Sequence, residues 1–234
     1  MKYMGSKNRI AKHILPIMID EAKKHCITKW VEPFVGGGNM IDKVPDSFER
    51  IGYDINDHVI HAMIDIRDNI HLLPDSLTEE QYKTLKSLPP ASINSYLRFV
   101  ASFGGRFDRG YAREKGSDCS TFLGYGKRNA IKQSPRIQNV EFICANYKDL
   151  DFHDCLIYCD PPYQGTSGYK TGELDHYQFF AWCRQQAKKN LVFVSEYSAP
   201  DDFNEVWRGE IKTNFASSRK QATHNAVEKL FRCY

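Results

Sequence analysis

The stretch Ile157-Tyr158-Cys159-Asp160-Pro161-Pro162-Tyr163 decides the fold class of this 234-residue chain. An apolar run typical of a buried strand stops at an acid, and two prolines and an aromatic residue follow. Open α/β sheets place reactive groups at the carboxyl ends of their strands, so the pattern predicts an α/β fold. Because the prolines donate no backbone hydrogen bond, the carbonyls of Asp160 and Pro161 are available as acceptors. With the flat face of Tyr163 beside them they suit a planar ring carrying an amino group, although the same pattern can simply end a strand.

A second motif is the glycine-rich turn Glu32-Pro33-Phe34-Val35-Gly36-Gly37-Gly38-Asn39, which follows a predicted strand at 27–31. Glycines allow positive φ and close approach of the backbone to a ligand. A strand at 50–53 then ends in Asp54, about 20 residues after the turn, where nucleotide-binding α/β folds place a carboxylate on ribose hydroxyls. The turn lacks the dinucleotide fingerprint and alone fits a flexible loop. Together with Asp54 it favours an adenosine-type cofactor.

The rest of the chain alternates between helical and strand patterns, as an α/β fold requires. Ser6 is a candidate cap for a first helix that ends near His25 and is expected to kink at Pro16. The pattern predicts further helices at 57–69, 79–88, 92–103 and 175–189, and strands at 140–144, 156–159, 191–195, 210–214 and 227–233.

The segment 98–136 differs from its surroundings in charge and composition. It holds nine lysines and arginines against three acids, which is +6 in a chain whose net charge is +3. Glycines and aromatic residues are interleaved with the basic ones. Basic side chains attract phosphates and aromatic rings stack on bases, so the segment predicts a nucleic-acid surface. A solvated loop region is the alternative.

Composition excludes several classes of protein. The seven cysteines form no CxxC pair and are odd in number, which argues against a disulfide framework and a zinc site and favours a reducing interior. No window approaches the roughly 20 apolar residues of a membrane span, so we expect no membrane association. The cytoplasm is the expected location.

Four motifs occur in one order: Lys2-Tyr3-Met4-Gly5-Ser6-Lys7, the glycine turn, Asp54 after the second strand, and Asp160-Pro161-Pro162-Tyr163. Together with 158–166 and the ending 227–231, this set resembles the Dam-like, D12 class DNA adenine-N6 methyltransferases of bacteria and phages over nearly the whole chain. The resemblance implies their group alpha layout. We therefore expect a Rossmann-like fold dependent on S-adenosylmethionine (AdoMet), with a seven-stranded, mostly parallel sheet, no metal, a catalytic domain at 1–60 and 138–234, and an inserted DNA-recognition region at 61–137.

The resemblance also implies roles for individual residues. The catalytic set is Asp160, Pro161, Pro162 and Tyr163, with Asp160 and the Pro161 carbonyl accepting from the adenine amino group and Tyr163 stacking on the flipped base. The cofactor set is Tyr3, Lys7, Glu32, Phe34, Gly36, Gly38, Asp54, Ile55, Asn146, Tyr147 and Asp160. Charge and context alone select the candidates for DNA contact, which are Arg106, Arg109, Arg113, Lys127 and Arg128.

Other activities stay open from the sequence. A cytosine-N4 or RNA amino-methyltransferase is the nearest alternative, although cytosine-N4 enzymes more often resemble Ser-Pro-Pro-Tyr, and a DNA-binding module without catalysis is a second. The expected partner is double-stranded DNA, with a cognate restriction endonuclease as a possible further partner. We expect a monomer or weak dimer in a bacterial or phage-infected cell. The middle region shows no residue-by-residue match to the Dam recognition hairpin, so the target sequence is undetermined.

Overall fold

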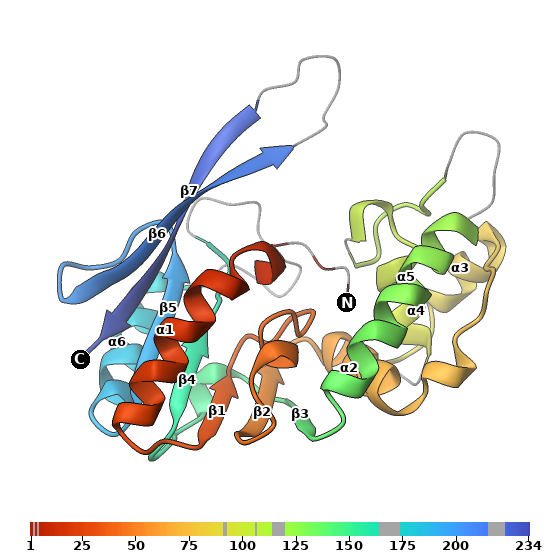
Figure 1. Cartoon of the computed structure of the whole chain (residues 1–234). Coiled ribbons are helices and arrows are strands. Elements are labelled where there is room, and N and C mark those ends of the chain that lie inside the picture. Colours follow the sequence, from red (N-terminus) through yellow and green to blue (C-terminus); the bar gives the residue numbers. More distant parts are fainter. Residues whose placement is uncertain are drawn as a thin grey trace.

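A seven-stranded sheet organises the chain, with its strands in the order β3-β2-β1-β4-β5-β7-β6 (Figure 1). The computed structural model describes residues 1, 3, 5–90, 93–105, 107–113, 120–163, 174–214 and 223–234. The strands are β1 (Lys29–Glu32), β2 (Glu49–Asp54), β3 (Val140–Cys144), β4 (Leu156–Cys159), β5 (Leu191–Glu196), β6 (Phe203–Asn214) and β7 (Thr223–Cys233). The first five pair in parallel, and β7 runs antiparallel to both of its neighbours. The predicted mostly parallel seven-stranded sheet is confirmed.

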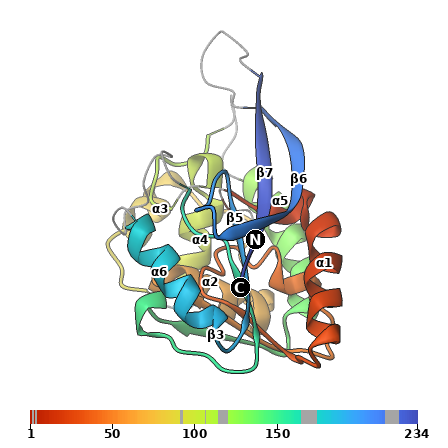
Figure 2. The same cartoon turned by 90° about the vertical axis from the view of Figure 1, so that its left-hand side faces the viewer.

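Helices cover both faces of this sheet. They are α1 (Ala11–Lys24), α2 (Asp57–Asp68), α3 (Glu79–Leu85), α4 (Asn94–Val100), α5 (Ser120–Gln133) and α6 (His176–Ala187). Short 3-10 turns are η1 (Lys7–Arg9), η2 (Ile41–Lys43), η3 (Ile70–Leu72), η4 (Phe103–Gly105), η5 (Ser134–Arg136) and η6 (Tyr147–Asp149). Figure 2 shows α1 and α6 on opposite sides of the sheet.

The apolar core is divided by the sheet into two clusters, and strand β4 contributes to both. Its side chains alternate, with Leu156 and Tyr158 in the cluster under α1 and α2, and Ile157 and Cys159 in the cluster under α6. Successive residues of a strand point to opposite faces, so a strand covered on both sides is apolar throughout. This double burial fixes the position at which β4 ends, and therefore the position of Asp160.

The sequence located most elements but missed one helix. Helix α5 lies in the stretch that we expected to be a glycine- and aromatic-rich insertion. Its buried residues Leu123, Gly126 and Ala130 are spaced as on one helical face. A Cβ on Gly126 would lie 2.1 Å from Val100 Cγ2 in α4, so this glycine permits two helices to pack closely instead of marking a turn.

Pro16 lies within the continuous helix α1, and Ser6 caps the turn η1 through Asn8 N.

The predicted division into two domains stays a prediction. Its first boundary, between residues 60 and 61, falls inside α2. Side chains from the expected insertion, such as Tyr96 and Leu123, belong to the same apolar cluster as Trp30 of β1. Within the described ranges, no helix is long and apolar enough to cross a membrane.

Arg98 was counted among the basic residues of the expected nucleic-acid surface, but its charge is used inside the fold. The side chain is 5% exposed and forms a two-pronged ion pair with Asp108, at 2.8 Å from Nε and 2.5 Å from Nη2. A third nitrogen donates to the carbonyl of Leu88 at 3.0 Å. The pair therefore holds the loop after α4 against the loop before it.

We predict that Arg98→Met lowers the free energy of unfolding by about 3–5 kcal/mol, because it removes the two-pronged ion pair of the largely buried Asp108 and leaves that charge poorly compensated. Urea denaturation measures this. The double variant Arg98→Met/Asp108→Asn removes both charges and should recover part of the loss. A single variant as stable as the wild type would contradict the buried pair.

Candidate active site

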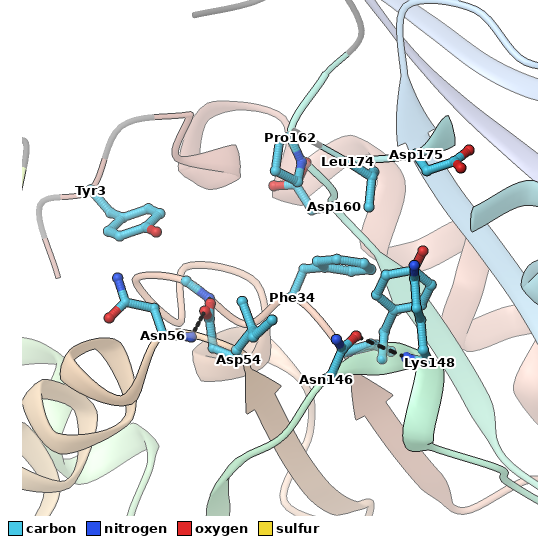
Figure 3. A pocket seen from close by; sticks show the side chains of 14 residues that line it. Tyr3, Phe34, Asp54, Asn56, Asn146, Lys148, Asp160, Pro162, Leu174 and Asp175 are labelled. Carbon is cyan, nitrogen blue, oxygen red and sulfur yellow. Dashed lines mark hydrogen bonds between the residues drawn. The ribbon is translucent and has the colours of Figure 1, made fainter. Parts of the chain in front are cut away.

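A cavity of about 270 Å³ lies at the carboxyl ends of β1, β2, β3 and β4 (Figure 3). Tyr3 lies at one end and Asp175 at the other, with Phe34 between them. The cavity is lined by Tyr3, Pro33, Phe34, Gly36, Asp54, Ile55, Asn56, Asn146, Tyr147, Lys148, Asp160, Pro162, Leu174 and Asp175. In an α/β sheet this is the edge where ligands bind. The strand order reverses between β1 and β4, and ligands bind at such a switch point.

The glycine turn after β1 holds Asp54 through the backbone. Gly36 N donates to Asp54 Oδ2 at 3.1 Å, and Asn56 N donates to Oδ1 at 2.9 Å. Gly36 has φ +48°, and a Cβ there would lie 3.0 Å from the ring of Tyr3, so a larger residue would be strained and would displace that ring. A carboxylate has more acceptor positions than these two bonds use, and it can still accept from hydroxyl groups.

Apolar and aromatic surface forms the other side of the cavity. The ring of Phe34 packs 5.2 Å from that of Tyr147 and 5.6 Å from that of Phe179, which fixes its orientation. Ile55 is 49% exposed at the cavity, although it is a large apolar residue. The side-chain oxygen of Asn146 accepts from Lys148 N at 3.1 Å and so begins the turn η6. Such a wall suits a flat ring.

Asp160 belongs to a cluster of charged groups beside the cavity. Lys7 Nζ lies 3.0 Å from Asp160 Oδ1 and 3.6 Å from Glu228 Oε2. The same ammonium lies 4.3 Å from the centre of the Tyr163 ring, and the Tyr163 hydroxyl donates to Glu228 at 2.6 Å. Four segments of the chain thus meet at one point: η1, the end of β4, the turn after it, and β7.

Burial governs the pKa values of these groups. Burial raises the pKa of Asp160 to about 6, and the Lys7 ammonium only partly offsets this. Burial likewise raises the pKa of Asp54 to about 6, against the opposing effect of the two backbone N–H groups. Burial alone would lower the pKa of Lys7, but Asp160 and Glu228 outweigh it and the pKa is raised. Lys7 is therefore a cation at neutral pH.

The structure brings most of the predicted site residues together. Nine of them line the cavity: Tyr3, Phe34, Gly36, Asp54, Ile55, Asn146, Tyr147, Asp160 and Pro162. Lys7 and Tyr163 adjoin it through the Asp160 cluster, and Pro161 is buried between Asp160 and Pro162.

Two predicted cofactor residues, Glu32 and Gly38, are not part of the cavity wall. Glu32 is buried and accepts from Trp30 Nε1 at 2.9 Å, and burial raises its pKa well above the usual range. Gly38 has φ +63°, and its carbonyl accepts from Gln133 at 3.0 Å. Glu32 is the last residue of β1, and Gly38 is tied to α5 through Gln133.

Some residues of the site were not predicted. Pro33, Asn56, Lys148, Leu174 and Asp175 line the cavity. Glu228 lies in the segment 227–231 that resembles the family, but it was given no role. Its signal in the sequence is an acid followed by Lys229 within a predicted strand, where a solvent-facing residue is the ordinary expectation.

The described candidates for DNA contact are not among the residues that line the cavity. Arg109, Arg113 and Arg128 are exposed, and Arg106 lies outside the described residues. Arg128 packs over the exposed ring of Tyr125 at 4.5 Å, while Arg113 pairs with Glu79 and Lys127 pairs with Asp75 at 2.7 Å. Figure 1 shows α3 to α5 on one side of the amino-terminal segment and the β6–β7 hairpin on the other.

No group of three or more His, Cys, Asp or Glu able to hold a metal occurs among the described residues. The six cysteines in that part of the chain are free thiols, and none of them lines the cavity.

The D12 class N6 adenine-specific DNA methyltransferases match this chain over residues 3–109 and 124–198. The chain belongs to this family. The sheet order and the antiparallel β7 are those of a Rossmann-like AdoMet-dependent methyltransferase, as predicted.

Two relatives are type II methyltransferases. M.FokI of Planomicrobium okeanokoites is 27% identical over 228 residues, covering 85% of this chain and 34% of its own length. M.MjaIII of Methanocaldococcus jannaschii is 24% identical over 202 residues, covering 70% of this chain and 68% of its own length. The chain thus spans about a third of M.FokI and about two thirds of M.MjaIII. Magnesium protoporphyrin IX methyltransferase of Synechocystis PCC 6803, solved with bound SAM, has a TM-score of 0.41 at 8% identity and covers 98% of this chain and 80% of its own.

The raised pKa of Asp54 predicts a specific pH dependence of stability. Its folded pKa of about 6 lies above the usual value of 3.8, so its contribution to stability is fully present below pH 3.8 and is lost as pH rises through 6. Relative to Asp54→Asn, the wild type should therefore lose about 1–3 kcal/mol of unfolding free energy between pH 4 and 8. Urea denaturation across this range tests it. Asp201→Asn, at an exposed acid, is the control, and its free energy of unfolding should change with pH as that of the wild type does. If the free energy of unfolding of Asp54→Asn also changed with pH as in the wild type, the raised pKa of Asp54 would be refuted.

Proposed function

We propose that this protein transfers the methyl group of AdoMet to N6 of adenine in double-stranded DNA, at a specific site. The observation that carries the proposal is Asp160, an acid directly after β4 that is 22% exposed, lines the cavity and pairs with Lys7. The family match favours adenine N6 over the cytosine-N4 and RNA alternatives.

The residues of the cavity fit AdoMet. Asp54 keeps acceptor positions for the two hydroxyls of a ribose, and Ile55 and Tyr147 offer apolar surface to the adenine ring. Asn146 borders the same wall and is the candidate for the adenine edge. Tyr3, Phe34 and Gly36 would enclose the methionine and sugar portions, with Lys7 and Asp160 at that end and Glu32 and Gly38 supporting the turn. AdoMet supplies an electrophilic methyl group on a sulfonium.

The role of Asp160 follows from the chemistry of the acceptor. The exocyclic amino group of adenine is a poor nucleophile, because its lone pair is delocalised into the ring. The carboxylate of Asp160 and the carbonyl of Pro161 can each accept one of its two hydrogens. Among the described residues, none is seen to donate to that carbonyl. Acceptors placed in this way stabilise the positive charge that develops on nitrogen, and they do so most strongly in the transition state.

Tyr163 provides the surface on which the target base would stack. Its hydroxyl is held by Glu228 and its ring packs edge-on against Tyr197 at 4.6 Å, so the ring is fixed before DNA binds. A base inside a duplex cannot reach the end of β4, and we propose that the adenine is flipped into the site.

We predict that Asp160→Asn lowers the rate of N6-methyladenine formation by at least about a hundredfold, as loss of one preorganised group does elsewhere. The measurement is incubation of unmethylated plasmid with AdoMet, followed by nucleoside mass spectrometry. Asp202→Asn, in an exposed pair with Arg184, is the control and should keep full activity. Wild-type protein that makes no N6-methyladenine would sink the proposed function, and an active Asp160→Asn would sink the mechanism.

Exposed basic residues in the region of α3 to α5 would bind the DNA backbone and contact base edges. Arg109, Arg113, Lys127 and Arg128 are the described candidates, together with Arg106. Arginine binds guanine in the major groove through two hydrogen bonds, so these residues are also candidates for sequence recognition. A cognate restriction endonuclease and a monomeric or weakly dimeric state stay predictions.

We predict that Arg109→Ala and Arg128→Ala each weaken DNA binding and reduce its dependence on salt. A side chain that neutralises one phosphate contributes about 0.9 to the slope of log affinity against log salt concentration. Fluorescence anisotropy of a labelled duplex at several salt concentrations gives the slope. Lys23→Ala, at an exposed lysine of α1, is the control. Equal slopes for all four proteins would place the DNA surface elsewhere.

A further inference from the structure

Glu228 is a carboxylate that the reaction described above does not use, yet it is 9% exposed and part of the Asp160 cluster. It lies on β7, far in sequence from the other members. Its Oε2 atom accepts from the Tyr163 hydroxyl at 2.6 Å and lies 3.6 Å from Lys7 Nζ. A buried acid in such a position needs a reason, because burying a charge is costly unless it is paired.

The reason follows from the charges of the cluster. Lys7 Nζ lies 3.0 Å from Asp160, and a buried ammonium paired with a single carboxylate forms a neutral unit. A neutral unit attracts a developing positive charge far less than a free carboxylate does. With Glu228 included, the cluster holds two carboxylates and one ammonium, which leaves a net charge of −1. Because Lys7 is shared between the two acids, it neutralises Asp160 only in part, and Asp160 is the acid of this cluster that lines the cavity.

We propose that Glu228 is a positioning residue: it shares the Lys7 cation and is held by Tyr163, and so keeps the charge of Asp160 available to the cationic cofactor and to the target amine. The part that concerns the amine depends on the proposed function. The part that concerns charge is independent of the acceptor, because the sulfonium and ammonium of AdoMet are positive whatever the methyl group is transferred to.

The titration of Asp160 gives a readout that a merely structural role would not change. The groups facing Asp160 are Lys7 from η1, Glu228 from β7, Tyr163 from the turn, Tyr158 from β4 and Glu32 from β1. The pKa of Asp160 is raised to about 6, chiefly by burial, and the negative charge of Glu228 also raises it. Without that charge Lys7 acts on Asp160 alone, and the pKa of Asp160 must fall.

The test compares Glu228→Gln with the wild type by titrating AdoMet calorimetrically between pH 5 and 8. Glu228→Gln keeps an oxygen for the Tyr163 hydroxyl and removes only the charge. We expect its AdoMet affinity at pH 8 to fall several-fold, and the midpoint of the rise in affinity with pH to move to lower pH. On DNA, kcat should fall at least tenfold. Glu205→Gln, on β6 and paired with Arg208 and Lys229, is the matched control and should change none of these.

Unchanged affinity and an unchanged midpoint in folded Glu228→Gln would overturn the inference. Should Glu228→Gln fail to fold, Glu228→Asp retains the charge, and a midpoint equal to that of the wild type supports the charge argument whereas a shifted one opposes it. Wild-type protein that binds AdoMet but leaves DNA unmethylated would refute the proposed function alone, since the AdoMet titrations would still decide the role of Glu228.

Discussion

The ion pair between Lys7 and Asp160 is the interaction on which the arrangement of the site depends. Asp160 follows a strand whose side chains are buried on both faces, so it cannot move into solvent without disturbing both halves of the core. An acid held there needs a compensating charge. Lys7 supplies it, and the pair ties the turn η1 to the carboxyl end of β4.

That path also explains the glycine turn after β1. The ring of Tyr3 lies against Gly36, so closely that a Cβ would meet it at 3.0 Å. The turn can therefore accommodate the amino-terminal segment above it while its N–H group holds Asp54 from β2. Two acids at the ends of separate strands are thus held by Lys7 and by the glycine turn, and both line the cavity.

The sequence predicted what is local and periodic. Strands β1, β2 and β4 end in the motifs found in the sequence, and the acids Asp54 and Asp160 stand where strand ends were expected. Features that depend on distant partners were missed. Helix α5 was missed because Gly126 reads as a loop residue, although it allows contact with Val100. Arg98 was interpreted as a surface charge, because the sequence around it does not indicate that it pairs with Asp108. That pair depends on the conformation of the loop after α4, in which Asp108 itself has a positive φ.

Glu228 was missed for a reason of topology. Strand β7 is antiparallel and inserted between β5 and β6, and its register pairs Lys229 with Glu196, the last residue of β5. Glu228 therefore lies one residue beyond the carboxyl end of β5, on the same edge as Asp160. In a parallel strand at this place, the residues after the paired segment 229–233 would lie at that edge, and Glu228, which precedes the segment, would lie toward the opposite end of the sheet. The reversal of one strand thus gives the site its second carboxylate.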